Sequence, residues 1–336
     1  MSTLLDDRWA LAKESTYGTG VTVTRFYPML DETDSDWDPR PRQGMGLQGG
    51  NGRRAMLGSR RFLPIGQGKI TTKVELESKG AGVLFDAICG SSTVTAITGG
   101  AQMLFHDGIA TTTLSSYTLQ IVKVQNNGTE WVETYSGCTV SKWTIEQPED
   151  AIPTLTVEWD ARSVTTATAA ASVTYASAPV IFDHSQGAAG LGGTLTAPTT
   201  TVLATGLTAY ADVVSYKLEV DQAIDASRWV LGSRSQPTVG IPKIAFTGSF
   251  EFNATTVPAG LIAGTKFPLY VTYTTTETLG AGTTQLQVVL PQVALTGKLP
   301  QTKRDTTREI EVSADVLSDG TNKDFWLVYR TTDTAL

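Results

Sequence analysis

The sequence is poor in charged side chains and in the residue types that build catalytic and metal sites. Of its 336 residues, 18% are charged, which is below the roughly 25% typical of soluble domains. It contains two histidines and two cysteines. Because so few charges leave less strongly solvated surface, the composition favours a chain that buries much of its surface against other protein.

Long apolar runs are also missing. No stretch approaches the roughly 18 consecutive apolar residues of a membrane span, and Asp6, Asp7 and Arg8 stand where a signal peptide needs an apolar run. Cys89 and Cys138 lack metal-ligand spacing and are too few for a disulfide framework. Each sits beside glycine in a largely apolar segment, so we predict buried free thiols, folding in a cytoplasm and no membrane partner.

The charge balance argues against tight nucleic-acid binding. The formal net charge is −7 and the isoelectric point is about 5.0, whereas proteins that grip phosphates carry basic patches. The balance is compatible with a surface that nucleic acid passes without sticking.

The few candidate catalytic residues have no convergent partners. His106 precedes an Asp-Gly turn, and His184 follows Asp183, which is able to orient a general base. No serine or cysteine in a nucleophile elbow accompanies them. We therefore predict exposed or capping histidines, no catalytic residues and no cofactor.

Two motifs imitate ligand sites. Asp34, Asp36 and Asp38 have the spacing that opens a calcium loop, but Pro39 and Met45 occupy the positions that need glycine and glutamate. Residues 44–52 are glycine-rich but lack the Gly-Lys-Ser/Thr ending of a phosphate loop and a following helix. We predict no metal site, and weak cation binding at an assembled interface stays open.

Strand signals dominate the rest of the chain. Apolar and polar residues alternate with period two, the pattern of a half-buried strand, and Asn127-Gly128 between two such runs indicates a hairpin. We predict an all-β fold. The alternating runs cover residues 69–77, 117–121, 155–160, 216–221 and 309–312.

Helix signals are scarce. The apolar block at residues 81–89 ends at Gly90, a suitable C-cap, and residues 257–263 predict a weaker counterpart. Residues 31–54, acidic and then rich in Gly, Arg and Pro, have no regular period, which at that length indicates a functional or disordered segment. Residues 185–205, rich in Gly, Ala and Thr, are typical of an interdomain connection.

The sequence contains an internal repeat. Leu57-Gly58-Ser59-Arg60 recurs as Leu231-Gly232-Ser233-Arg234, and Lys69-Ile70 recurs as Lys243-Ile244. The segment from Val140 also resembles the segment from Val293. The constant offset and common order favour a duplication, and convergent strand patterning is the alternative. The division expected from it is an N-terminal segment (1–56), a first β domain (57–182), a linker (183–209) and a second β domain (210–336).

Several short sequence segments, taken in their order along the chain, resemble segments of the tail tube proteins (major tail proteins) of long-tailed, siphovirus-type phages, particularly those of actinobacterial hosts. The resemblance covers most of the chain apart from the linker, and its motifs are structural. The phrases are Glu14-Ser15-Thr16-Tyr17-Gly18-Thr19, Val23-Thr24-Arg25-Phe26-Tyr27-Pro28, Ser59-Arg60-Arg61, residues 68–77, Ile88-Cys89-Gly90-Ser91, residues 117–122, residues 135–140 and residues 325–329.

The resemblance implies tandem β-sandwich or barrel domains with one or two short helices. Such domains join side by side into rings whose inner strands form a continuous barrel, and rings stack into a conduit for DNA ejection. Expected partners are other copies of the chain, the tape-measure, terminator and distal tail proteins, and DNA in transient passage. The expected location is the virion tail, assembled in the host cytoplasm. Two domains per chain favour three copies per ring, with six as the alternative.

Two groups of residues are candidates for these roles. An arm at residues 31–54 places acidic and basic stretches where they can pair with neighbouring subunits and set register. Glu75, Glu77 and Glu251 are candidates for the lumen, where negative charge keeps DNA from binding. The arm candidates are Asp31, Asp34, Asp36, Asp38, Arg40, Arg42, Arg53 and Arg54.

Rival interpretations share the β fold. One is another virion or secretion-apparatus β protein, such as a tail terminator or the inner tube of a contractile tail. Another is a carbohydrate-binding β-sandwich that uses Trp131, Trp143 or Trp159, although alternating placement in strands favours core tryptophans. An enzyme is the class that the sequence supports least.

Overall fold

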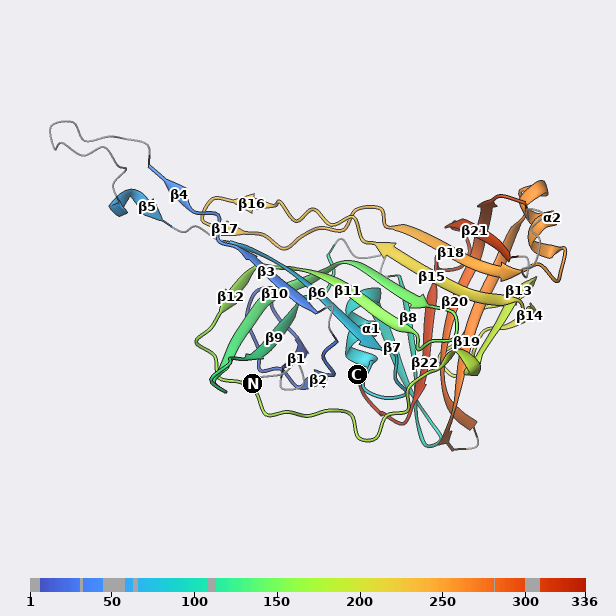
Figure 1. Cartoon of the computed structure of the whole chain (residues 1–336), viewed down its shortest axis with the longest axis horizontal. Helices are drawn as coiled ribbons and strands as arrows, with labels where there is room; N and C mark the ends of the chain where they lie inside the picture. The colour runs from blue at the N-terminus through green and yellow to red at the C-terminus, as the bar shows by residue number, and fades with distance from the viewer. Residues whose placement is uncertain are drawn as a thin grey trace.

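The computed structural model describes residues 7–30, 33–44, 58–62, 66–107, 113–280, 282–299 and 309–336. Their alternating pattern produces antiparallel strands throughout, with two short α-helices (Figure 1). The first part of the chain forms β1 (Arg8–Lys13), β2 (Arg25–Tyr27), β3 (Asp34–Asp38), β4 (Arg42–Gln43), β5 (Arg61–Phe62), β6 (Gln67–Glu75), α1 (Gly82–Cys89), β7 (Gly90–Ile97), β8 (Gly100–Asp107), β9 (Tyr117–Val124), β10 (Glu130–Gln147), β11 (Thr154–Ala161) and β12 (Ser163–Thr165).

The second part repeats much of this order. It forms β13 (Gly187–Thr196), β14 (Thr205–Ala209), β15 (Val213–Asp221), β16 (Trp229–Val230), β17 (Ser233–Arg234), β18 (Lys243–Glu251), α2 (Thr256–Ala263), β19 (Lys266–Leu279), β20 (Gly282–Gly297), β21 (Glu309–Val316) and β22 (Trp326–Thr331). Short 3-10 turns lie at Gly58–Arg60 and His184–Gln186. The prediction of a mostly β chain with two short helices is confirmed.

Both helices end where the sequence predicts. Gly90 after α1 and Gly264 after α2 have φ of 73° and 63°, the left-handed conformation that closes a helix. The two helices differ in environment, because α1 is almost wholly buried and α2 leaves much of its surface exposed. In the described part of the chain, neither helix nor any other is long and apolar enough to span a membrane.

Two segments without an evident period contain strands. Within residues 31–54, β3 pairs with β6 over all five of its residues, so the absence of regular structure predicted there is wrong for this part. Within residues 185–205, β13 pairs with β19 from Gly187 to Leu191. Tertiary pairing overrides weak local propensity in both cases.

Eight strand segments form one curved sheet. Their order is β3–β6–β11–β10–β15–β18–β21–β20, with every neighbouring pair antiparallel. Long strands β10 and β20 bend out of this sheet, and their other halves pair with β9 and β19 in outer layers. The described ladders branch without closing a ring, so a single chain shows no closed barrel.

The strand pairing repeats along the chain. In the first part, β1–β2, β1–β9, β9–β10, β10–β11, β11–β6, β6–β3 and β10–β12 are paired. In the second part, the same scheme appears as β13–β14, β13–β19, β19–β20, β20–β21, β21–β18, β18–β15 and β20–β22. The hairpin β7–β8 is additional to the first copy. The sheet topology therefore has the internal repeat that the sequence matches suggest.

The two copies are continuous with one another. β10 of the first pairs with β15 of the second, and β22 pairs with β8. A single large core results, which includes the tryptophans Trp143 and Trp159 at 1% exposure. The division at residues 183–209 stays a prediction, and strands β13 and β14 occupy most of that interval.

A buried carboxylate fixes the N-terminal strand to this core. Glu14 follows β1 and is 6% exposed. It accepts hydrogen bonds from the backbone N–H groups of Gly18 (2.9 Å) and Gly137 (2.8 Å) and from the hydroxyls of Ser116 (2.8 Å) and Thr118 (2.9 Å). These contacts explain the Glu-x-Thr-Tyr-Gly-Thr phrase, since Glu14 holds the turn at Gly18 against β9 and β10.

We predict that Glu14→Ala lowers the free energy of unfolding by about 3 kcal/mol, because four donors lose a charged acceptor. Denaturant unfolding of the unassembled chain measures this loss. The matched control is the exposed Glu149→Ala, for which a change within about 0.5 kcal/mol is expected. Equal effects of the two variants would contradict the role given to Glu14.

Candidate functional site: a polar sheet face and two hairpin arms

The eight-stranded sheet has one apolar and one polar face. Side chains of the apolar face, such as Ile70, Trp143 and Phe246, lie in the core. Since neighbouring positions alternate between faces, every second residue of all eight strands points to the other side. There acidic side chains outnumber basic ones: Asp34, Asp36, Asp38, Glu75, Glu146, Glu158, Glu219, Asp221, Glu251, Glu309, Glu311 and Asp315 against Lys69, Lys73, Lys142, Lys217 and Lys243.

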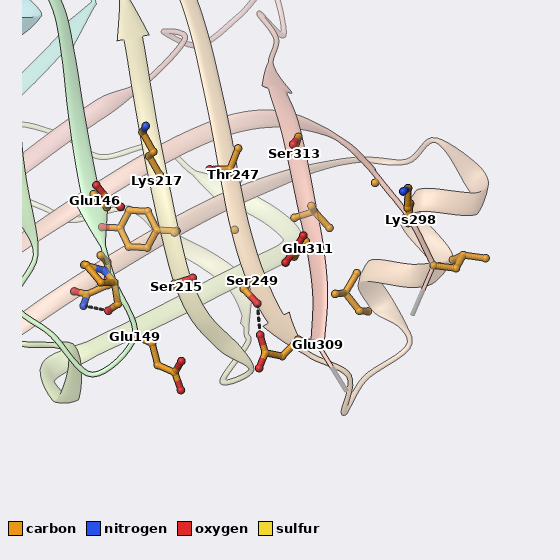
Figure 2. Close-up of a pocket in the computed structure, with 18 residues that line it drawn as sticks. Glu146, Glu149, Ser215, Lys217, Thr247, Ser249, Lys298, Glu309, Glu311 and Ser313 are labelled. Carbon is orange, nitrogen blue, oxygen red and sulfur yellow. Dashed lines mark hydrogen bonds between the residues drawn. The ribbon is translucent and has the colours of Figure 1, made fainter. Parts of the chain in front are cut away.

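The polar face is hollowed at one end. A depression of about 1140 Å³ lies over β10, β15, β18, β21 and the end of β20. Figure 2 shows its lining, in which Lys217, Thr247, Ser249 and Glu311 project from adjacent strands. Ser249 donates a hydrogen bond of 2.8 Å to Glu309. An open hollow lined by hydroxyls and charges is a wetted surface and offers no enclosed apolar pocket of the kind that small ligands fill.

Two of the three acids predicted for a lumen lie on this polar face. Glu75 ends β6 and Glu251 ends β18, and both strands occupy the same place in their copies of the repeat. Glu77 lies beyond the end of β6, where it bridges to Ile181. Burial, together with the charge of Glu75, raises the pKa of Glu77. The structure thus brings these acids to one end of the sheet, and their lumen role stays a prediction.

The predicted arm divides into a strand and a hairpin. Asp34, Asp36 and Asp38 belong to β3 and are exposed on the polar face. Beyond β3 the chain leaves the sheet, and β4 pairs with β5 at Arg42. Arg40 forms an ion pair of 3.0 Å with Asp38. The other three candidates, Asp31, Arg53 and Arg54, lie outside the described residues.

A second hairpin arm, β16–β17, occupies the matching place in the second copy. It follows β15 as the first arm follows β3, and Figure 1 shows both arms at the same end of the sheet. The guanidinium of Arg40 lies 5.3 Å from the ring centre of Trp229, so the arms touch. Sequence reasoning missed this arm as an element, although the repeated Leu-Gly-Ser-Arg phrase marked its position.

The second arm is anchored on the first copy. Arg234 is 1% exposed and forms a buried ion pair with Asp160 of β11. It also donates to the carbonyls of Ala161 (2.8 Å) and Ala226 (2.8 Å). A guanidinium with these acceptors satisfies both buried charges. The ion pair therefore holds the two copies together in addition to their shared strands.

The two ends of the sheet differ in their charged side chains, with arginines beside Asp38, Asp221 and Asp225 at the arm end and mostly glutamates at the other. Arg40, Arg42, Arg60, Arg61 and Arg228 extend from the arm end. The other end carries Glu75, Glu146, Glu251 and Glu309 near the ends of their strands, and Glu149 in the turn between β10 and β11.

The remaining candidate groups have structural surroundings. Nε2 of His106 lies 3.1 Å from the Ser91 hydroxyl, and His184 starts a short 3-10 turn. Both cysteines are buried and free, as predicted, and burial raises the pKa of each thiol. Within the described ranges no group of three or more metal-binding side chains is found.

We predict that Arg234→Met destabilises the chain by about 3 to 5 kcal/mol, because Asp160 is left as an uncompensated buried charge. Denaturant unfolding measures the effect. Arg228→Met is the matched control on the same arm, since Arg228 is exposed, and should change stability by about 0.5 kcal/mol or less. A loss for Arg234→Met no larger than that of the control would contradict the anchor.

The comparisons with known proteins agree with this geometry. The chain matches the family model described as phage tail tube protein over residues 7–316 and belongs to that family. No curated protein matches it. The chain is therefore a structural, non-enzymatic component of the virion tail that polymerises into the tail tube.

Proposed function

We propose that this phage tail tube protein builds its tube from rings of three chains, in which each chain supplies two equivalent units. The rings stack into the conduit of a long, sheathless, siphovirus-type tail, as the sequence phrases that resemble actinobacteriophage tail proteins suggest. Rings of six chains are the alternative if only one copy of the repeat enters the inner wall.

The repeated sheet carries the proposal. Strands β3, β6, β11 and β10 form one four-stranded unit, and β15, β18, β21 and β20 form the second. The ladder between β10 and β15 joins them side by side within one chain. Three chains joined in the same way supply six units and remove every exposed strand edge from the inner wall.

The polar hollow of the sheet suits the inside of a channel. Its excess of carboxylates repels DNA phosphates, so DNA passes without binding. Glu75, Glu77 and Glu251 are the lumen candidates at one end of each unit. The apolar face packs outward against the rest of the chain, which leaves the wetted face for the lumen.

The hairpin arms suit contacts between stacked rings. Their arginines, including Arg40 and Arg42, are at the opposite end of the sheet from the carboxylates of Glu75 and Glu251. Charge complementarity of this kind sets orientation and register more than affinity. The same role in ring stacking is proposed for Asp34, Asp36 and Asp38. It is also proposed for Asp31, Arg53 and Arg54, which lie outside the residues that the structure describes. The tape-measure protein inside the tube and the terminator and distal tail proteins at its ends are the expected partners.

Electron microscopy and native mass measurement of the purified chain test the proposal. Long, flexible tubes without a sheath, and rings with the mass of three 35.8 kDa chains, are the expected result. Rings that stop at a single layer would favour a tail terminator, and rings of six chains would overturn the stoichiometry. A stable monomer that binds glycans would favour the carbohydrate-binding rival, against which Trp143 and Trp159 are already buried.

Charge reversal of the lumen candidates tests the orientation of the wall. We predict that Glu75→Lys, Glu77→Lys and Glu251→Lys together leave tubes intact but slow DNA ejection by about ten-fold or more, because lysines at positions 75 and 251 of the polar face bind passing phosphates. The rate of DNA release from virions that carry the variant measures the change in ejection.

Single variants supply the control for that experiment. Glu251→Lys is compared with Glu130→Lys, whose exposed ion pair with Arg8 lies off the polar face and contributes little stability. Only Glu251→Lys should slow ejection. Unchanged ejection in the triple variant would reject the placement of these acids in the lumen.

A further inference from the structure

The joint between the two copies provides a template for the joint between chains. In β10 and β15, Lys142 lies opposite Asp221 and Thr144 lies opposite Glu219. A diagonal ion pair of 3.0 Å between Lys142 and Glu219 supports this register. β10 belongs to the first copy of the repeat and β15 to the second. A second joint of the same kind therefore needs the strand that takes the place of β10 in the second copy and the strand that takes the place of β15 in the first.

Those strands are β3 and β20, which form the two edges of the eight-stranded sheet. β3 is the first-copy counterpart of β15, and in the described part of the chain it pairs only with β6. β20 is the second-copy counterpart of β10. Its residue Ala294 has partners on both sides, Lys266 and Asp315. From Leu295 to Gly297, the described ladders engage only the side that faces β21.

The ladders also fix which residues are equivalent. Lys69 lies opposite Asp36, and Lys243, its counterpart in the sequence repeat, lies opposite Asp221, so Asp36 corresponds to Asp221. By the same counting, Asp34 corresponds to Glu219. On the other side, Val140 and Val293 are counterparts in the repeat.

The same residue-by-residue match between β10 and β20 extends to the open edge of β20. Lys142 follows a bulge after Val140 and corresponds to Ala294. Thr144 therefore corresponds to Thr296. Because Thr144 lies opposite Glu219 in the internal joint, the same register places Thr296 of one chain opposite Asp34 of the next.

The two open edges have complementary charge. β3 presents Asp34, Asp36 and Asp38, all exposed. The open stretch of β20 lies between two exposed lysines, Lys266 opposite Ala294 and Lys298 just beyond the strand. Opposite charges on facing strands stabilise a register.

The two helices differ in burial in the same way as the strands beside them. α1 lies beside the joint formed within the chain and is buried, whereas α2 lies beside the open edge of β20 and is exposed. Ile88 of α1 is fully buried, and its carbonyl accepts a 2.9 Å hydrogen bond from Gln222, which follows β15. Its counterpart Ile262 of α2 is 73% exposed. The counterpart of Gln222 is Trp37 of β3, so the next chain would bring an indole beside the exposed isoleucine.

We propose that β3 of one chain pairs antiparallel with β20 of a neighbouring chain, with Asp34 opposite Thr296, and that this joint covers α2 of the neighbouring chain. The inference rests on the proposed function and adds to it the partner edges and their register. The joint between chains begins at Leu295, because Lys266 already lies opposite Ala294, whereas within a chain the equivalent Lys142 lies opposite Asp221.

A paired-cysteine experiment tests the register. Directly opposite residues in an antiparallel pair have Cα atoms about 4.5 to 5.5 Å apart, which suits a disulfide. Chains carrying Thr296→Cys and Asp34→Cys are assembled into tubes and oxidised by O₂ with copper phenanthroline. The native thiols Cys89 and Cys138 are buried. We expect disulfide-linked dimers and trimers under denaturing conditions without reductant.

The control pair is Thr296→Cys with Asp38→Cys, which shifts one cysteine by four residues, about 13 Å along the strand. The matched pair should cross-link about ten-fold more than the shifted pair, since Cα atoms beyond about 7 Å cannot be bridged. Equal or absent cross-linking in tubes that form would overturn the register. Failure of the unaltered chain to form tubes would instead overturn the proposed function.

A second measurement uses the unaltered chain. A carbodiimide couples a carboxylate to a neighbouring amine as an amide, and mass spectrometry identifies the linked peptides. Tubes assembled from mixed ¹⁴N and ¹⁵N chains should yield mixed-isotope links from Asp34 or Asp36 to Lys266 or Lys298. Links confined to single-isotope pairs, or between other edges, would contradict the joint.

Discussion

The ladder between β10 and β15 is the constraint on which the arrangement of the whole chain depends. It aligns two four-stranded units so that their apolar faces share one core and their polar faces share one hollow. The buried ion pair of Arg234 with Asp160 fixes the same joint from the side of the arm. The joint between these two similar units is formed entirely within one chain.

The low charge content of the chain follows from this arrangement. One face of the eight-stranded sheet is core, and the outer layers pack on that core. Charges are concentrated where water or a neighbouring chain meets the protein, on the polar face and on the arms. Among the buried carboxylates, Glu14 is held by four donors and Asp160 by its ion pair with Arg234.

Strands with strong alternation and helices with glycine caps were predictable from sequence. Examples are β6, where period two is unbroken, most of β11 and β15, and α1, which ends at Gly90. β3 was not, because Asp-Ser-Asp-Trp-Asp has the composition of an acidic loop and becomes a strand only through pairing with β6. β13 is similar, since its glycines and alanines form a strand against β19.

The candidate site was predictable only in part, for a related reason. Alternation shows that Glu75 and Glu251 share a polar face with their neighbours, but not that this face is hollow. The second arm was marked by a repeated phrase, yet its anchor depends on Asp160, 74 residues earlier in the chain. Long-range partners of this kind have no local signature in a single sequence.

An electron cryomicroscopy map of the assembled tube shows directly how neighbouring chains join. We expect rings of threefold symmetry with six similar units, and an inner wall in which the sheet runs without a break from β20 of one chain into β3 of the next. Rings of strict sixfold symmetry, or an inner wall interrupted between chains, would contradict it.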